Sequence, residues 1–292
     1  MEAPEATPTR IGINLDGELV GDRSALHGWL DLFATLGFDC VEITPLGLIR
    51  NRVLNGRACS SLLNALSGYD FSYTVHAPME IDLANRSSFR FSEKMAKACI
   101  EFSALLDAKI LVLHSGYVRP EGKIPTPKAM ETLVSLTRRC ASYAGNMGIS
   151  VGIENGELAP IHFCRRIDRL LDVIKGIGMD NVGVTFDFGH AYLSANYYGF
   201  DFMGAVREAL PFIIHVHVTD NFGKFNPSEP GEKDTSLGLG DLHLPIGWGS
   251  VPYRDVFRLI RPVYKGVYLM EIDRRYKRHL RSSAMRVREL LG

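Results

Sequence analysis

The chain has 292 residues, of which 46% are hydrophobic and 23% are charged. This balance is typical of a folded globular protein, and a chain of this length buries a sizeable core, so extended disorder is excluded away from the ends. Lys plus Arg and Asp plus Glu each total 33, so the formal net charge is zero. The chain has no net positive charge that would attract a polyanion, so only a local basic patch could bind a nucleic-acid backbone.

The N-terminus and the cysteines indicate a soluble cytoplasmic protein. Residues 1–10 are polar and lack the basic-then-apolar order of a secretory signal, so we expect a flexible tail there. No apolar run approaches the roughly 18 residues of a membrane span. The cysteines are odd in number and contain no C-x-x-C pair, which predicts reduced thiols; they are Cys40, Cys59, Cys99, Cys140 and Cys164.

In chain order, short β-rich runs alternate with longer segments of helical spacing, as expected of repeated βα units. The runs cover residues 11–15, 40–44, 73–76, 110–114, 150–155, 182–187, 213–219 and 266–272. Apolar residues between Met130 and Met147 recur at helical intervals before Gly148, and Gly37 follows the segment 26–36 in the same way. Eight units without a linker predict an α/β fold, a (β/α)₈ TIM barrel, as a single domain over residues 11–292.

Residues 221–252 interrupt the alternation of predicted strands and helices. The segment is rich in Gly and Pro and much longer than a typical connection. Because it follows the seventh strand, it would lie on the C-terminal face, where barrel enzymes place their active sites. A floppy insertion is the alternative interpretation.

Polar residues end most of the predicted strands. Side chains alternate along a barrel strand, so residues of one parity near the C-terminal ends face a common pocket. In the seventh run His215, His217 and Thr219 share one face, and in the eighth Glu271 is nearest the end. The strand-end candidates are His76, His114, Glu154, Asp187, His190, His217 and Glu271, and the long loop adds Asp241 and His243.

This mixture of carboxylate and imidazole suits a hard or borderline divalent cation, whereas no thiolate cage is available. Each residue singly has a structural explanation, such as a core histidine or a Glu paired with Arg. Several carboxylates crowded in one barrel mouth, however, require compensating positive charge. The sequence therefore predicts a divalent-metal site, and we expect the long loop to fold over it.

The same residues resemble the xylose-isomerase-like barrel superfamily, which includes sugar isomerases and epimerases and also the abasic-site DNA repair enzyme endonuclease IV of AP endonuclease family 2. The resemblance spans residues 11–273 and rests on seven segments. These are Val75-His76-Ala77-Pro78, Leu113-His114-Ser115-Gly116, Ile153-Glu154-Asn155, Phe186-Asp187-Phe188-Gly189-His190, His217-Val218-Thr219-Asp220, residues 241–249 and Met270-Glu271.

The resemblance implies two ligand sets. In ketose epimerases four ligands hold one cation (Mn, Zn, Mg or Co), and by similarity these are Glu154, Asp187, His217 and Glu271. In endonuclease IV nine ligands hold up to three zinc ions, and by similarity His76, His114, His190, Asp241 and His243 join the first four. All nine residue types are present.

Departures weaken the endonuclease interpretation. The opening Ile11-Gly12-Ile13-Asn14 differs from the family's His-containing start, and Met79 stands where a DNA-contacting Tyr is expected. The loop after the second strand lacks the usual Arg-x-Trp. Basic residues that could clamp a sugar phosphate or a DNA backbone, or form a solvated face, are Arg50, Arg52, Arg57, Arg274, Arg275, Lys277 and Arg278.

The leading hypothesis is a metal-dependent isomerase or epimerase of a small sugar, sugar phosphate or related polyhydroxy carbonyl compound, acting through an enediolate. By similarity, Glu154 and Glu271 would exchange the proton. His190 and His243 would contact substrate hydroxyls and Trp248 would form an apolar lid, unless the indole is core packing. One alternative is a trinuclear zinc phosphodiesterase, and a nucleic-acid partner is expected only in that case. The other is a non-catalytic carbohydrate binder. Homo-oligomers occur among the relatives, and no membrane partner is expected.

Overall fold

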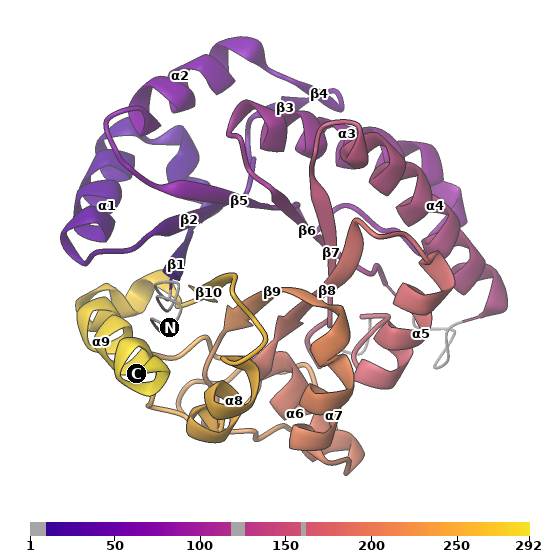
Figure 1. Ribbon diagram of the computed structural model, residues 1–292, viewed down its shortest axis with the longest axis vertical. Coiled ribbons are helices and arrows are strands. Elements are labelled where there is room, and N and C mark those ends of the chain that lie inside the picture. Colours follow the sequence, from indigo (N-terminus) through magenta and orange to yellow (C-terminus); the bar gives the residue numbers. More distant parts are fainter. Residues whose placement is uncertain (1–9, 118–125, 159–161) are drawn as a thin grey trace, which may run out of the picture.

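The computed structural model describes residues 10–117, 126–158 and 162–292. Within these residues, eight parallel strands close into one barrel in the order β1-β10-β9-β8-β7-β6-β5-β2. The strands form the central ring in Figure 1 and the helices surround them. Their bounds are β1 Arg10–Leu15, β2 Cys40–Ile43, β5 Ser72–His76, β6 Ile110–His114, β7 Ser150–Glu154, β8 Val182–Asp187, β9 Ile213–Val218 and β10 Val267–Met270.

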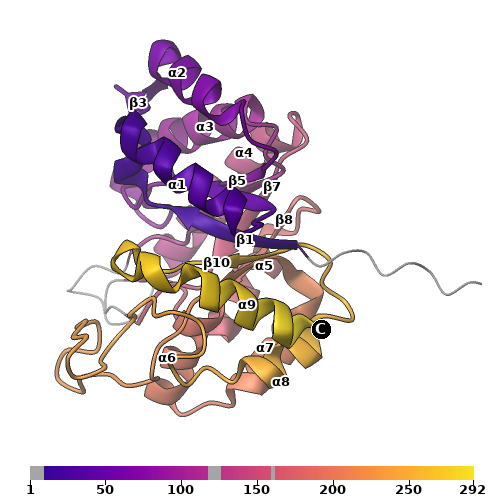
Figure 2. The same ribbon diagram turned by 90° about the vertical axis from the view of Figure 1, so that its left-hand side faces the viewer.

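The predicted (β/α)₈ barrel is thus confirmed. Arg10 is the first residue of β1, while the rest of the predicted N-terminal tail lies outside the described residues. The long helices run along the outside of the barrel, as the side view shows (Figure 2). They are α1 Arg23–Thr35, α2 Gly56–Leu66, α3 Phe89–Leu105, α4 Pro127–Gly145, α5 Ile167–Ile177, α6 Phe188–Tyr198, α7 Phe202–Ala209, α8 Tyr253–Ile260 and α9 Leu280–Leu291.

The connections between the barrel strands and helices contain short strands and 3₁₀ turns, which the hydrophobic periodicity of the sequence does not predict. A two-stranded hairpin follows β2, and four 3₁₀ turns occur in the described chain. These are β3 Ile49–Arg50, β4 Val53–Leu54, η1 Gly17–Gly21, η2 Arg86–Ser88, η3 Leu210–Phe212 and η4 Arg274–His279. They are too short to carry a hydrophobic period, which is why a periodic pattern does not predict them.

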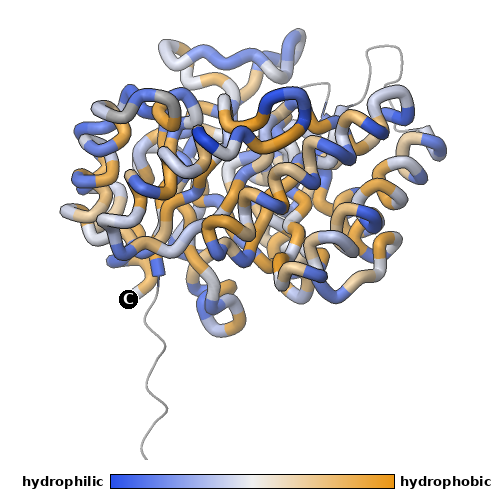
Figure 3. Tube along the Cα trace, turned by 90° about the horizontal axis from the view of Figure 1, so that it is seen from above, coloured by the Kyte–Doolittle hydropathy of each residue, from blue (hydrophilic) through white to orange (hydrophobic). Residues whose placement is uncertain are grey.

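The helices form because their apolar residues recur on one face. Hydrophobic and hydrophilic residues alternate along the helical coils in Figure 3, as expected when one face packs on the barrel and the other meets water. α4 begins at a Thr126 cap with Pro127 in its first turn, and Gly148 follows it at a φ of 68°. Gly37 has the same conformation after α1. The five cysteines are all buried and unbridged.

Within the described part of the chain, no helix combines the length and the hydropathy that a membrane crossing requires. The long segment after β9 has no helix until α8 and is held by isolated bridges, including Asp220 with Leu244 and Asp234 with Leu239. It folds back over the barrel, so the predicted position of this loop is confirmed.

Candidate metal centre

Four side chains at the C-terminal ends of the strands form what we call the inner cluster: Glu154, Asp187, His217 and Glu271. One potential ligand atom from each lies within 4.8 Å of those of the other three. His217 Nδ1 is 3.0 Å from Glu154 Oε1 and 3.6 Å from Glu271 Oε1. The first three residues belong to β7, β8 and β9, and Glu271 directly follows β10.

Strand register brings these side chains together. Glu154 pairs with His114 across β6 and β7, and Asp187 pairs with His217 across β8 and β9. The second pairing depends on a register shift between Val184 and Thr185, which leaves one β9 residue unpaired. Because a one-residue slip moves side chains to the opposite face, this bulge puts Asp187 beside His217 rather than beside Val216.

Gly183 makes room for that bulge. A Cβ atom at position 183 would lie 2.5 Å from the Ile214 side chain and 2.7 Å from the Phe212 carbonyl oxygen. No larger residue fits there without moving the backbone, so the placement of the Asp187–His217 pair depends on a glycine at the far end of the same strand.

Asp187 has a second task at the start of α6. Its Oδ1 accepts hydrogen bonds from the His190 backbone N–H at 2.6 Å and from the Thr219 hydroxyl at 2.8 Å. The carboxylate is therefore the N-terminal cap of the helix. Its other oxygen, Oδ2, is buried and has no hydrogen-bond partner among the described residues.

Two further imidazoles adjoin Glu154. His114 Nε2 lies 2.9 Å and His76 Nε2 lies 3.2 Å from Glu154 Oε2, and the two imidazole nitrogens are 3.3 Å apart. His76 Nδ1 is 2.9 Å from the Ala77 carbonyl oxygen and donates its proton to it, so Nε2 is the ring nitrogen directed at the cluster and becomes a lone-pair donor when its own proton is lost. A nitrogen with this orientation is available as a metal ligand.

The outer cluster consists of His190, Asp241 and His243. Asp241 Oδ2 is 2.7 Å from His243 Nε2 and 3.5 Å from His190 Nε2. His190 lies in the first turn of α6, whereas Asp241 and His243 come from the long loop after β9. The Nδ1 of His190 is 3.0 Å from the Asn155 carbonyl oxygen, which fixes the ring orientation.

One buried carboxylate anchors the long loop. Asp220 accepts backbone N–H bonds from Gly247 at 2.8 Å, Gly249 at 3.0 Å and Asn221 at 3.0 Å. Val251 N–H adds a longer contact of 3.4 Å. These bonds tie the end of the loop to the end of β9, and so help to place His243 over the barrel mouth.

The electrostatics show how strongly the centre attracts positive charge. Burial alone would raise the pKa of Glu154, but His114 and His217 hold it well below its usual range. Burial would lower the pKa of His76, yet Glu154 raises it to about 9. Burial raises the pKa of Asp187 to about 6; His190 opposes that change and Glu154 adds to it. Without a cation, protonated imidazoles must balance these carboxylates.

The donor set fits a divalent cation. Carboxylate oxygens and imidazole nitrogens are the ligands that such ions take, and buried carboxylates without charge compensation are costly. Asp187, a member of the inner cluster, has one carboxylate oxygen, Oδ2, that is buried without a hydrogen-bond partner among the described residues and that a cation would satisfy. His114 Nδ1 and Asp241 Oδ1 are likewise buried without a hydrogen-bond partner in the described residues. The inner cluster, which offers four potential ligands, is thus the strongest candidate cation site among the described residues.

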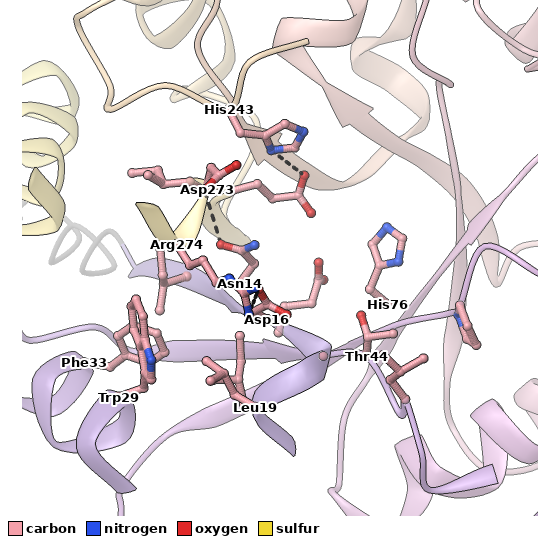
Figure 4. Close-up of a pocket in the computed structure, with 18 of the residues that line it drawn as sticks. Asn14, Asp16, Leu19, Trp29, Phe33, Thr44, His76, His243, Asp273 and Arg274 are labelled. Atoms are coloured by element: carbon pink, nitrogen blue, oxygen red, sulfur yellow. Dashed lines mark hydrogen bonds and ion pairs between the residues drawn. The ribbon is translucent and has the colours of Figure 1, made fainter. Parts of the chain in front are cut away.

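A cavity of about 520 Å³ opens beside the centre. His76 and His243 lie at one side of it, and Trp29, Phe33 and Leu19 form an apolar wall at the other (Figure 4). Its volume is within the range of about 300–1,000 Å³ that small-molecule sites occupy. Of the predicted metal residues, Glu271, His76 and His243 line this cavity.

Only two of the predicted basic residues reach the cavity. Arg274 lines it but is paired with Asp16 and Glu18, and Lys277 lies 4.3 Å from the centre of the Trp29 ring. Arg50, Arg52, Arg57, Arg275 and Arg278 are exposed and do not line it.

Trp248 is also placed away from the cavity. It is 48% exposed and packs on His279 and Tyr276. The lid role of this indole remains a prediction, because the cavity lining does not include it.

Sequence reasoning missed Glu42. This buried residue of β2 lies 3.1 Å from His217 Nε2 and 3.2 Å from His215 Nε2, and it accepts a hydrogen bond from Thr74 at 2.8 Å. Burial would raise its pKa, but His217 and His215 hold it well below its usual range. The signal was a lone acid in the apolar run Cys40-Val41-Glu42-Ile43. Lys233 of the long loop was missed as well.

The sequence matches the family described as Xylose isomerase-like TIM barrel over residues 30–290. It is 27% identical over 252 residues to the uncharacterized protein MJ1311 of Methanocaldococcus jannaschii, covering 85% of this chain and 79% of that protein. Since the family match covers most of the chain, this protein belongs to the xylose isomerase-like TIM barrel family.

Solved structures share the fold. A D-tagatose 3-epimerase-like protein superposes with a TM-score of 0.74 at 23% identity, over 97% of this chain and 100% of that one. A xylose isomerase-like TIM barrel protein from Mycobacterium smegmatis in complex with magnesium gives a TM-score of 0.74 at 17% identity, over 98% and 96% of the two chains.

Proposed function

We propose that this member of the xylose isomerase-like TIM barrel family is a divalent-metal-dependent isomerase or epimerase of a polyhydroxy carbonyl compound, a sugar or a sugar derivative. The observation that carries the proposal is the inner cluster: two glutamates, an aspartate and a histidine within 4.8 Å of one another beside a cavity large enough for a sugar. The names of the structural neighbours, which are sugar epimerases and xylose isomerase-domain proteins, point the same way.

Glu154, Asp187, His217 and Glu271 would hold the cation. When bound, a divalent cation supplies Lewis acidity that polarises a carbonyl group and offsets the negative charge that develops when a neighbouring C–H is deprotonated. Manganese, magnesium, cobalt and zinc all accept oxygen and nitrogen donors of this kind.

The proton is moved by the two glutamates. Glu154 and Glu271 come from strands that lie three places apart around the barrel, so their carboxylates approach a bound molecule from different sides. One removes a proton from the substrate carbon, and the other returns a proton to the enediolate. If the return is to the opposite face of the same carbon the product is an epimer. If it is to the neighbouring carbon, and the hydroxyl proton passes from one oxygen of the enediolate to the other, the product is an aldose–ketose isomer.

Other side chains bind and orient the substrate. His76 and His243 line the cavity next to Glu271 and offer imidazole groups to substrate hydroxyls. His190 is a further candidate from the outer cluster. The apolar wall of Trp29, Phe33 and Leu19 excludes water from the opposite side of the cavity.

The test is proton exchange in deuterated water. We expect the purified protein, stripped with EDTA and reloaded with Mn²⁺, Mg²⁺, Co²⁺ or Zn²⁺, to incorporate deuterium at one carbon of a ketose or ketose derivative, read by NMR. Removing the metal should abolish exchange and restoring it should recover the rate. A panel of free, phosphorylated and glycosylated sugars would identify the substrate class.

Two outcomes would contradict the proposal. Absence of exchange across the panel in the metal-loaded protein, with sugars still bound, would indicate a non-catalytic carbohydrate binder. Three zinc ions per chain together with cleavage of abasic-site DNA would indicate the phosphodiesterase chemistry of the endonuclease IV relatives.

A further inference from the structure

A lysine lies within the outer cluster. The Nζ of Lys233 is 3.1 Å from Asp241 Oδ2 and 3.1 Å from Glu157 Oε2. Asp241 Oδ2 is also the oxygen that His243 and His190 approach, at 2.7 Å and 3.5 Å. The ammonium group therefore shares the carboxylate oxygen around which His190, Asp241 and His243 are gathered.

The long loop places this lysine by its own backbone. Asp234 and Leu239 exchange two hydrogen bonds, of 3.1 and 2.9 Å, and the Gly240 N–H donates to the Lys224 carbonyl at 2.9 Å. The Asp234 carboxylate accepts from the Ser236 and Leu237 backbone N–H groups. Residues 234–239 thus form a closed turn, and Lys233 and Asp241 lie on either side of its base.

Gly240 allows the backbone segments on the two sides of this turn to approach each other. Its φ is 81°, and a Cβ atom there would lie 2.2 Å from the Glu232 carbonyl oxygen. Only glycine combines that left-handed conformation with so close an approach. The pairing of Lys233 with Asp241 is therefore built into the loop rather than being a chance surface contact.

We infer that the Lys233 ammonium takes the place of a metal ion at the outer cluster, so that this chain binds its cation at the inner cluster and leaves His190, Asp241 and His243 without one. The three residues have the types and the spacing of a metal site. A protonated lysine, however, has three donors and no acceptor, so it cannot serve as a ligand and occupies Asp241 Oδ2 instead.

The charge of the ammonium group supports this inference. One positive charge is already placed against the carboxylates of Asp241 and Glu157. A dication added at Asp241 would be repelled by an ammonium group a few ångströms away. Asp241 is 5% exposed.

The consequence is a limit on metal loading. The inference rests on the metal-binding part of the proposed function, although not on any particular substrate. A centre whose outer cluster already holds an ammonium group at Asp241 Oδ2 is not suited to a mechanism with three metal ions.

Metal counting tests the inference directly. Wild-type protein and the Lys233→Met variant are equilibrated with Zn²⁺, freed of excess by gel filtration and analysed for zinc per chain. We expect Lys233→Met to hold one more ion than the wild type, and the additional change His190→Ala to remove that extra ion. Lys224→Met is the matched control, because Lys224 lies in the same loop over the Phe222 ring and should leave the count unchanged.

An equal count in the wild type and in folded Lys233→Met would overturn the inference. If that variant does not fold, anomalous scattering from zinc-loaded wild-type crystals decides instead: an ion bound by Asp241 would overturn the inference, and an ion held only at or near the inner cluster would support it. Failure of the proposed function is a separate result, namely wild-type protein that carries metal at the inner cluster and exchanges no substrate proton.

Discussion

The inner and outer clusters contain the same kinds of donor but are held in different ways. Glu154, Asp187 and His217 lie on three adjacent barrel strands and are at most 1% exposed, so the hydrogen-bonded sheet and the core fix them. Asp241 and His243 depend on a loop that is held by the Asp220 carboxylate and by a closed turn at residues 234–239.

This difference indicates a division of tasks. A barrel strand cannot shift without disturbing its neighbours, so the inner cluster suits chemistry that needs fixed geometry. A loop opens at lower cost than a strand does, so the outer cluster suits contacts that admit and release a substrate. The predictions below test each side of this comparison in turn.

The largest effect is expected in the inner cluster. Glu154→Gln and Glu271→Gln should each slow turnover by about 10²–10⁴-fold, the usual contribution of a positioned general acid or base. The readout is the rate of deuterium exchange, with circular dichroism to verify folding. Glu101→Gln, at a glutamate that accepts a hydrogen bond from Tyr143, is the control and should keep the wild-type rate. A near-normal rate in either inner-cluster variant would remove that glutamate from the proton-transfer role.

The residues of the inner cluster could be predicted because they follow strand ends in an alternating pattern that barrel closure converts into proximity. Glu42 could be noticed only as a lone acid in an apolar run; its contact with His217 could not be predicted, since the sequence does not show which strands face one another across the barrel. Lys233 could not, because its position depends on the turn at residues 234–239 and on Gly240, which produce no periodic signal. The sequence also gives no sign of the bulge at β9. The bulge precedes His215, so His215 and His217 still share one face of the strand, as predicted.

A smaller effect is expected beneath the inner cluster. Glu42→Gln removes the carboxylate that faces His217 Nε2, and partners of this kind orient a ligating imidazole. We expect metal affinity to fall by about 10–100-fold, measured by competition with a fluorescent chelator. Thr74→Val, which removes only the hydroxyl bonded to Glu42, should have a weaker effect in the same direction. Unchanged affinity in Glu42→Gln would mean that the barrel alone orients His217.

The loop side of the comparison is tested at Asp220. In the wild type, backbone N–H groups donate to the Asp220 carboxylate. Asp220→Asn replaces this carboxylate with an amide group, which should lower the free energy of unfolding by about 2–3 kcal/mol. Amide hydrogen exchange at Gly247 and Gly249 should accelerate, while metal binding at the inner cluster is retained. Equal exchange in the two proteins would show that the loop is held by other contacts.

The smallest effect is expected at the cysteines, which belong to the barrel framework. Burial raises the pKa of Cys40 to about 11 and that of Cys140 and Cys164 to about 12, so none of these is a thiolate at pH 8. We expect the native protein to react negligibly with a disulfide reagent at that pH and the unfolded protein to expose five thiols. Rapid reaction of a native thiol, or loss of turnover in a Cys→Ser variant, would indicate a thiol group in the mechanism.

The double engagement of Asp187 limits how the protein can diverge. The carboxylate that faces the cation site is also the cap on which the first turn of α6 is built, and α6 in turn delivers His190. A substitution at Asp187 that cannot cap a helix would therefore fray α6 as well as alter the candidate cation site, whereas Asn or Ser could keep the cap and remove the ligand charge. A capping residue at this position in a distant homologue is thus weaker evidence of a retained cation site than a glutamate at the position of Glu271.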